Sequence, residues 1–103
     1  MNFDHKHSFS PEEALERLRA LGDYLTNRHG IAINWRDDSN ATFKGKYLVV
    51  KIEGDFKLED DMIRVRGKDP GMLWRKKATK YLKEKLEKYL DPSTPVDALD
   101  RHA

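Results

Sequence analysis

The chain has 103 residues and no cysteine; 38% of the residues are hydrophobic, 37% are charged, and the formal net charge is +2. This length suits one domain, because two cores of half the size would each be marginal, and the lack of cysteine excludes disulfides, thiolate metal sites and cysteine nucleophiles. The longest uninterrupted apolar run, residues 47–50, is far shorter than the ~20 residues that span a bilayer. Residues 1–7 lack the apolar core of a signal peptide, so we expect a cytoplasmic protein.

The first residues alternate between ring-bearing and polar side chains. Phe3, His5, His7 and Phe9 share one parity, which predicts a strand over residues 2–9. His5 and His7 therefore point the same way and resemble a two-ligand metal clip. No third ligand stands near them in the sequence, and histidines packed beside phenylalanines are the commoner arrangement. We predict that this pair holds no transition metal.

A helix is predicted over residues 11–29. Ser10 is typical of an N-cap, Pro11 of the first helical position, and Glu13 would close a capping box with Ser10. A stripe of apolar residues follows at helical spacing. Gly30 can adopt the left-handed conformation that ends many helices.

Four strands are predicted next, centred on residues 31–35, 41–43, 47–58 and 63–65. Gly45-Lys46, with glycine first, is typical of a type II′ hairpin turn before the long strand 47–58. The even positions of that strand are apolar except for Gly54. We therefore expect the sheet to curl at Gly54 or a helix to approach it closely.

A second helix is predicted over residues 70–90, with Asp69 as N-cap and Pro70 as its first residue. The order β-α-β-β-β-β-α predicts one α+β domain over residues 1–92, an antiparallel sheet with both helices packed on one face. Residues 93–103 are predicted to form a loosely held tail.

No motif predicts catalysis. The acidic residues at 37–38 and 59–61 fall in predicted turns, where Asp is favoured by local hydrogen bonding, and neither group has the spacing of an EF-hand. The chain has no Walker A loop, no G-x-G-x-x-G and no G-x-S-x-G. A two-layer domain of this size also offers little room for a pocket of convergent polar groups. We predict a non-enzymatic protein with no catalytic residue, cofactor or metal.

The charge is unevenly placed. Residues 64–88 contain ten Lys/Arg and three Asp/Glu, a local charge of +7, while the remainder carries −5. Such a helix either binds an anionic partner or is a solvated face that keeps the protein in solution. Three large apolar residues also follow one another at its start, and one stripe cannot bury all three, so they either plug the end of the core or form an apolar contact site. The candidate partner-binding residues are Met72, Leu73, Trp74, Arg75, Lys76, Lys77, Lys80 and Lys83.

Several short motifs occur in order along the chain. They are H-S at 7–8, E-E-A at 12–14, H-G at 29–30 followed by Trp35, T-F at 42–43, D-P-G-M-L-W-R-K-K-A-T-K-Y-L at 69–82 and Y-L-D-P at 89–92. With these motifs, residues 3–92 resemble the polyhydroxyalkanoic acid system family, small bacterial proteins named for their association with polyhydroxyalkanoate storage. The second helix is richer in lysine than this family leads one to expect. The resemblance implies a cytoplasmic protein linked to storage granules, and it implies no catalytic residue.

Three functions remain open at this point. The first is a non-enzymatic accessory protein that binds a granule surface or a granule protein through the basic helix. The second is an RNA- or DNA-binding module, because the order α-β-β-β-α at the end of the chain is similar to the double-stranded RNA-binding domain. The third is a carrier of small apolar ligands, similar to a shortened helix-grip fold, with a cavity at Gly54. The oligomeric state is not predicted.

Overall fold

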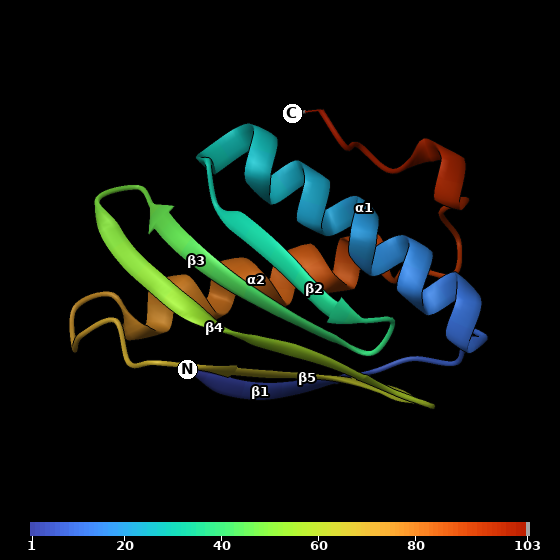
Figure 1. Cartoon of the computed structure of the whole chain (residues 1–103), viewed down its shortest axis with the longest axis horizontal. Helices are drawn as coiled ribbons and strands as arrows, with labels where there is room; N and C mark the ends of the chain where they lie inside the picture. Colours follow the sequence, from blue (N-terminus) through green and yellow to red (C-terminus); the bar gives the residue numbers. More distant parts are fainter. Residues whose placement is uncertain (103) are drawn as a thin grey trace.

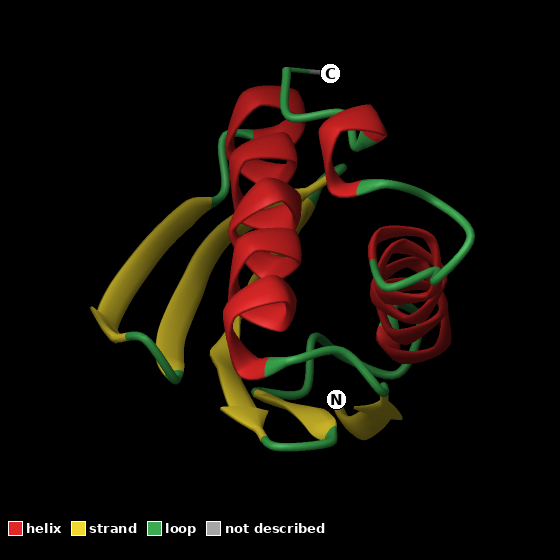
Figure 2. Cartoon of the chain, turned by 90° about the vertical axis from the view of Figure 1, so that its right-hand side faces the viewer, coloured by secondary structure: helices red, strands yellow, loops and turns green. Residues whose placement is uncertain are grey.

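Five strands form one antiparallel sheet, and both helices lie on the same face of it in the computed structural model, which describes residues 1–102 (Figure 1). In chain order the elements are β1 (Asn2–Lys6), α1 (Pro11–His29), β2 (Ala32–Asp37), β3 (Asn40–Tyr47), β4 (Val50–Glu59), β5 (Met62–Gly67), α2 (Arg75–Tyr89) and the short 3-10 helix η1 (Val96–Ala98). The strand order is β1-β5-β4-β3-β2, so β1 and β2 are the two edges. The sheet bends around the helices (Figure 2). This confirms the predicted α+β fold and its element order.

Helix α1 begins and ends at the predicted residues. The Ser10 hydroxyl accepts a hydrogen bond from the Glu13 backbone N–H at 3.2 Å, and Gly30 has φ +71° and donates its N–H to the Thr26 carbonyl. Only the Ser10 half of the expected capping box forms. The Glu13 carboxylate instead accepts a hydrogen bond from Arg17 Nε at 2.9 Å. The sequence signals of this helix are local, which explains why its bounds were predictable.

The core lies between the helices and the inner face of the sheet. The buried side chains there include Leu18, Leu21, Phe43, Ile52, Ile63, Val65, Ala78, Leu82 and Leu86, whereas Trp35 and Val50 are partly buried. Phe43 lies opposite Gly54 on the neighbouring strand, and a Cβ at Gly54 would come within 2.7 Å of the Phe43 ring. An aromatic ring therefore fills the gap that this glycine leaves in the inner face.

The start of α2 was predicted wrongly. The helix begins at Arg75, not at residue 70, and residues 68–74 form a loop in which Gly71 has φ +105°. Asp69 is not an N-cap; its carboxylate accepts from the Gly71 N–H at 3.0 Å and from Arg75 Nε at 3.2 Å. The backbone at Gly71 is incompatible with a right-handed helix, so Asp69 and Pro70 remain outside it.

The turn before β4 was also misplaced. Strand β3 continues through Gly45 and Lys46 to Tyr47, and the two turn residues are Leu48 and Val49. Position 45 of the strand requires glycine, because a Cβ there would come within 2.8 Å of the Ile31 Cα. Tertiary packing, not turn chemistry, explains this glycine. The strand predicted over residues 2–9 likewise ends earlier, at Lys6.

The C-terminal residues 93–102 follow α2 back across α1. Leu99 is 7% exposed within the core, and the Tyr89 hydroxyl donates to the Asp100 carbonyl. Arg101 pairs with Asp23 of α1 at 3.0 Å. We expected these residues to be loosely held; residue 103 lies outside the described part of the chain.

Candidate functional site

The candidate residues divide between a loop and a helix. Met72 and Leu73 lie in the loop and are 84% and 90% exposed, whereas Trp74 is half-buried. Met72 and Leu73 therefore do not pack into the end of the core, which was the alternative that the sequence left open for Met72, Leu73 and Trp74. The other candidates, Arg75, Lys76, Lys77, Lys80 and Lys83, are all exposed on α2. The structure thus places two exposed apolar side chains directly before a basic helix.

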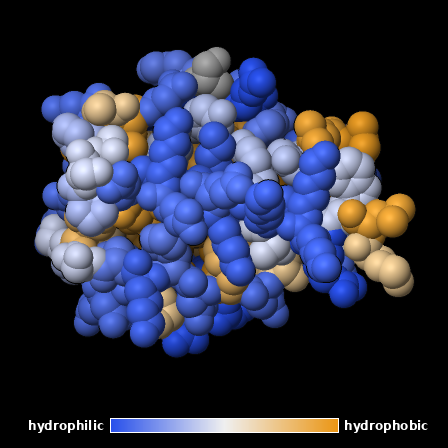
Figure 3. Space-filling model, turned by 180° about the vertical axis from the view of Figure 1, so that it is seen from behind, coloured by the Kyte–Doolittle hydropathy of each residue, from blue (hydrophilic) through white to orange (hydrophobic). Residues whose placement is uncertain are grey.

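Helix α2 keeps these cations in solvent because its inner stripe is apolar. Ala78, Leu82, Leu86 and Tyr89 recur at three- and four-residue spacing and are buried against the core. The lysines occupy the remaining positions. Figure 3 views the molecule from behind, where the hydrophilic surface is blue and the apolar side chains gather at one end.

The cations differ in how they are compensated. Arg75 pairs with Asp69, and this interaction holds the pKa of the Asp69 carboxyl below its usual value. Lys80 lies 3.9 Å from Glu84. Within residues 1–102, Lys76, Lys77 and Lys83 have no carboxylate within 4.0 Å. Among the candidate residues, these three lysines are therefore the ones most available to an anionic partner.

Two of the unpaired lysines contact aromatic rings. The Lys77 Nζ lies 5.3 Å from the centroid of the Trp74 ring, and the Lys83 Nζ lies 5.5 Å from that of Phe3. Near Lys83, a groove of about 680 Å³ runs between the start of β1 and α2. Arg75, Lys76, Lys80 and Lys83 line it together with Glu84 and Glu87, so cations of α2 outnumber carboxylates in this groove.

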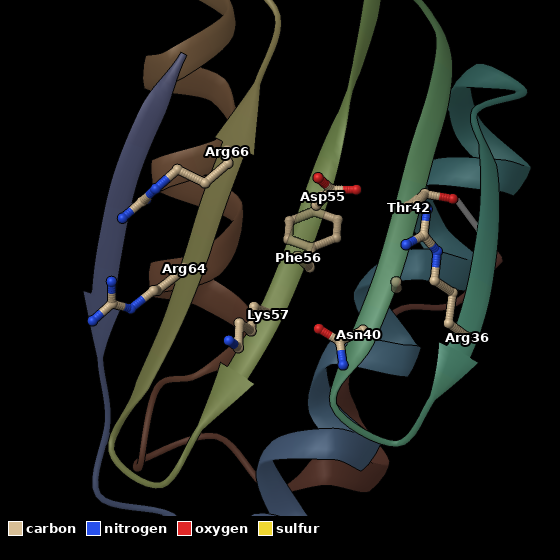
Figure 4. Close-up of a pocket in the computed structure, with 9 residues that line it drawn as sticks. Arg36, Asn40, Thr42, Asp55, Phe56, Lys57, Arg64 and Arg66 are labelled. Carbon is tan, nitrogen blue, oxygen red and sulfur yellow. The ribbon is translucent and has the colours of Figure 1, made fainter.

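A second hollow, of about 210 Å³, lies on the outer face of the sheet (Figure 4). Figure 4 shows Arg64 and Arg66 directed toward β1 and away from Asp55 and Arg36. Arg64 pairs with Glu59 at 3.1 Å and Arg66 with Asp4 at 2.9 Å. Because these charges are paired and do not converge, this face makes a weaker candidate site than α2.

His5 lies in β1 and His7 just after it, and both border a hollow that the end of α2 also lines. The His7 Nδ1 accepts from the Phe9 N–H at 3.2 Å, and the His7 and Phe9 rings stack. Burial, as the main cause, lowers the pKa of both His5 and His7. Among residues 1–102, no group of three or more His, Asp or Glu side chains is placed to hold a metal ion.

Sequence reasoning missed one pair of exposed apolar residues. Leu48 and Val49, at the β3–β4 turn, are 53% and 79% exposed. They belong to the longest apolar run of the chain, which was assigned to the inside of a strand because the turn was placed at Gly45-Lys46. The signal was therefore present in the sequence and was misread.

A comparison with protein families gives one match. A family model described as "Putative polyhydroxyalkanoic acid system protein" covers residues 1–93. The chain belongs to this family. Neither the curated proteins nor the solved structures include a significant match.

The match confirms the resemblance drawn from the sequence motifs. The matched range includes all of α2 and the loop before it, and it ends where the C-terminal segment begins. Among residues 1–102, no helix is long and apolar enough to cross a membrane.

Proposed function

We propose that this protein is a non-enzymatic, cytoplasmic accessory protein of the polyhydroxyalkanoate system that binds the storage-granule surface through α2 and the loop before it. The observation that carries the proposal is the meeting of exposed Met72 and Leu73 with the unpaired cations Lys76 and Lys77. Apolar side chains beside cations suit the surface of an apolar particle that carries acidic groups. The family membership supports a storage granule as that particle.

Salt separates this function from binding by charge alone. Exposed charge pairs weaken as salt screens them, while buried apolar area contributes ~25 cal/mol per Å² at any moderate salt concentration. Granule binding should therefore persist at moderate salt. Binding to duplex RNA depends on counterion release and should fall steeply.

The test is co-sedimentation with storage granules and, separately, with duplex RNA, each from low to moderate salt. We expect the wild type to sediment with granules throughout and the Lys76→Glu/Lys80→Glu variant to bind them more weakly. Lys6→Glu/Lys57→Glu, with the same change in charge on the sheet, is the control and should bind like the wild type. Absence of granule binding at every salt concentration, together with RNA binding that Lys76→Glu/Lys80→Glu abolishes, would replace this function by nucleic-acid binding.

The carrier hypothesis loses its main argument. It needs a cavity beside Gly54, and the Phe43 ring occupies that position. The nucleic-acid alternative keeps the unpaired lysines of α2 in its favour but gives no reason for the exposure of Met72 and Leu73.

A further inference from the structure

The β3–β4 turn has an unusual composition for its geometry. It contains only two residues, Leu48 and Val49, and Leu48 has φ +58°. Two-residue hairpin turns favour Gly, Asn or Asp where φ is positive, because a side chain with a Cβ is strained there. Here both turn residues are large, apolar and mostly exposed. The turn thus keeps two exposed apolar side chains at a cost in backbone strain.

The residues that flank the turn are unfavourable as well. Lys46 and Lys51 lie directly opposite each other on β3 and β4, and both are exposed. Like charges at directly opposed positions of antiparallel strands destabilise the pair. No carboxylate of residues 1–102 lies within 4.0 Å of either lysine. An anionic partner would remove this repulsion.

This turn and the loop before α2 lie at the same end of the long axis of the molecule (Figure 1). Within residues 1–102, the large apolar side chains that are exposed all belong to these two segments: Leu48, Val49, Met72 and Leu73. Figure 3 shows a group of hydrophobic side chains at one end of a mostly hydrophilic surface. The turn is held against α2 because the Tyr47 ring stacks on Tyr81, with centroids 4.4 Å apart.

The charges near this end complement an anionic surface. Carboxylates of the adjoining strand, loop and helix are paired, since Asp69 pairs with Arg75, Glu53 with Lys68 and Glu84 with Lys80. The unpaired cations are Lys46, Lys51, Lys76 and Lys77. Apolar tips surrounded by cations are the arrangement by which proteins bind at the interface of an anionic lipid layer.

We propose that the β3–β4 turn is a second binding element, and that it and the loop before α2 insert together into an anionic lipid layer on the granule surface. This rests on the proposed function and extends it, because it names the chemistry of the surface and the end of the molecule that contacts it. Leu48, Val49, Met72 and Leu73 enter the apolar part of the layer. Lys46, Lys51, Lys76 and Lys77 contact its anionic headgroups.

The test uses sedimentation with phosphatidylcholine vesicles that contain or lack phosphatidylglycerol. The wild type should bind only the anionic vesicles. Leu48→Gly/Val49→Asn should weaken that binding roughly tenfold, because two inserting side chains are lost. The same variant introduces the residues that a turn of this type prefers, so its urea midpoint should equal or exceed that of the wild type.

A matched pair of variants tests the cations. Lys46→Gln/Lys51→Gln should weaken vesicle binding, while Lys6→Gln/Lys57→Gln, at the other end of the sheet, should not. Equal binding of both vesicle types would overturn the anionic layer as the partner. If Leu48→Gly/Val49→Asn binds vesicles and granules like the wild type, the turn is not a binding element, although the proposed function stands. Failure of the wild type to sediment with granules refutes the proposed function itself.

Discussion

Arg17 is the only charged side chain that residues 1–102 bury, at 2% exposure. Its guanidinium donates to the backbone carbonyls of Tyr89, Asp91 and Thr94, and it also lies 4.2 Å from the Phe9 ring centroid. These carbonyls stand at the end of α2 and just beyond it, where helices leave acceptors without partners. A cation there also interacts favourably with the helix dipole. One residue of α1 thus satisfies the backbone carbonyls at the end of α2.

Replacing Arg17 by Met should lower the free energy of unfolding by about 2–4 kcal/mol, because it leaves buried carbonyls without donors while keeping most of the side-chain volume. Urea denaturation followed by circular dichroism measures the effect. Arg19→Met is the control, since the Arg19–Asp38 pair is exposed and such pairs contribute about 0–1 kcal/mol. Equal effects of the two substitutions would show that Arg17 does not organise this end of the protein.

At the scale of elements, two glycines differ in how much room their surroundings leave for an added side chain. Gly22 lies inside α1, and a Cβ there would make ordinary contact with Ile33 at 3.5 Å. Gly54 lies inside β4, where a Cβ would come within 2.7 Å of both Gly67 Cα and the Phe43 ring. The helix has room for a methyl group and the sheet has none.

Gly22→Ala should therefore stabilise the protein by about 0.5–1 kcal/mol, since alanine is the better helix former and the space is available. Gly54→Ala should destabilise it by about 1–3 kcal/mol through overpacking. Thermal unfolding of both variants gives the two signs in one experiment. Stabilisation by Gly54→Ala would mean that the backbone at Arg66 and Gly67, as well as the Phe43 ring, moves aside at little cost.

For the whole molecule, the question is where the domain ends. Leu99 packs into the same core as Leu25 and Tyr89. Asn27 also donates a side-chain hydrogen bond to the Arg101 carbonyl at 2.6 Å. The family match, in contrast, ends at residue 93. The C-terminal segment thus lies beyond the matched range and yet contacts α1.

Leu99→Ala measures how firmly this segment is held. If Leu99 belongs to the cooperative core, the substitution should lower the free energy of unfolding by about 2 kcal/mol or more. Asp97→Ala, at an exposed position of the same segment, should change it by less than about 0.5 kcal/mol. An equally small effect of Leu99→Ala would favour the loosely held tail predicted from the sequence.

The sequence by itself determined the features that depend on near neighbours. Helix α1 begins at a capping serine and a proline and ends before a glycine, and its apolar stripe needs no other segment to be recognised. The alternation in β4 and β5 fixed which side chains enter the core, and short motifs spread along the chain identified the family. The basic character of residues 64–88 and the eight candidate binding residues were likewise visible in the sequence.

Only the tertiary structure decided the positions where a distant segment overrides local preference. Gly45 looks like a turn residue but lies in β3, where the backbone of Ile31 leaves no room for a Cβ, and the turn falls at Leu48 and Val49. The glycine at position 71 delays α2 to Arg75, which leaves Met72 and Leu73 in an exposed loop. The apolar end of the molecule follows from both shifts. No local pattern predicts it, because residues 48–49 and 72–73 come to lie at the same end only once the strands have paired and α2 has packed on them.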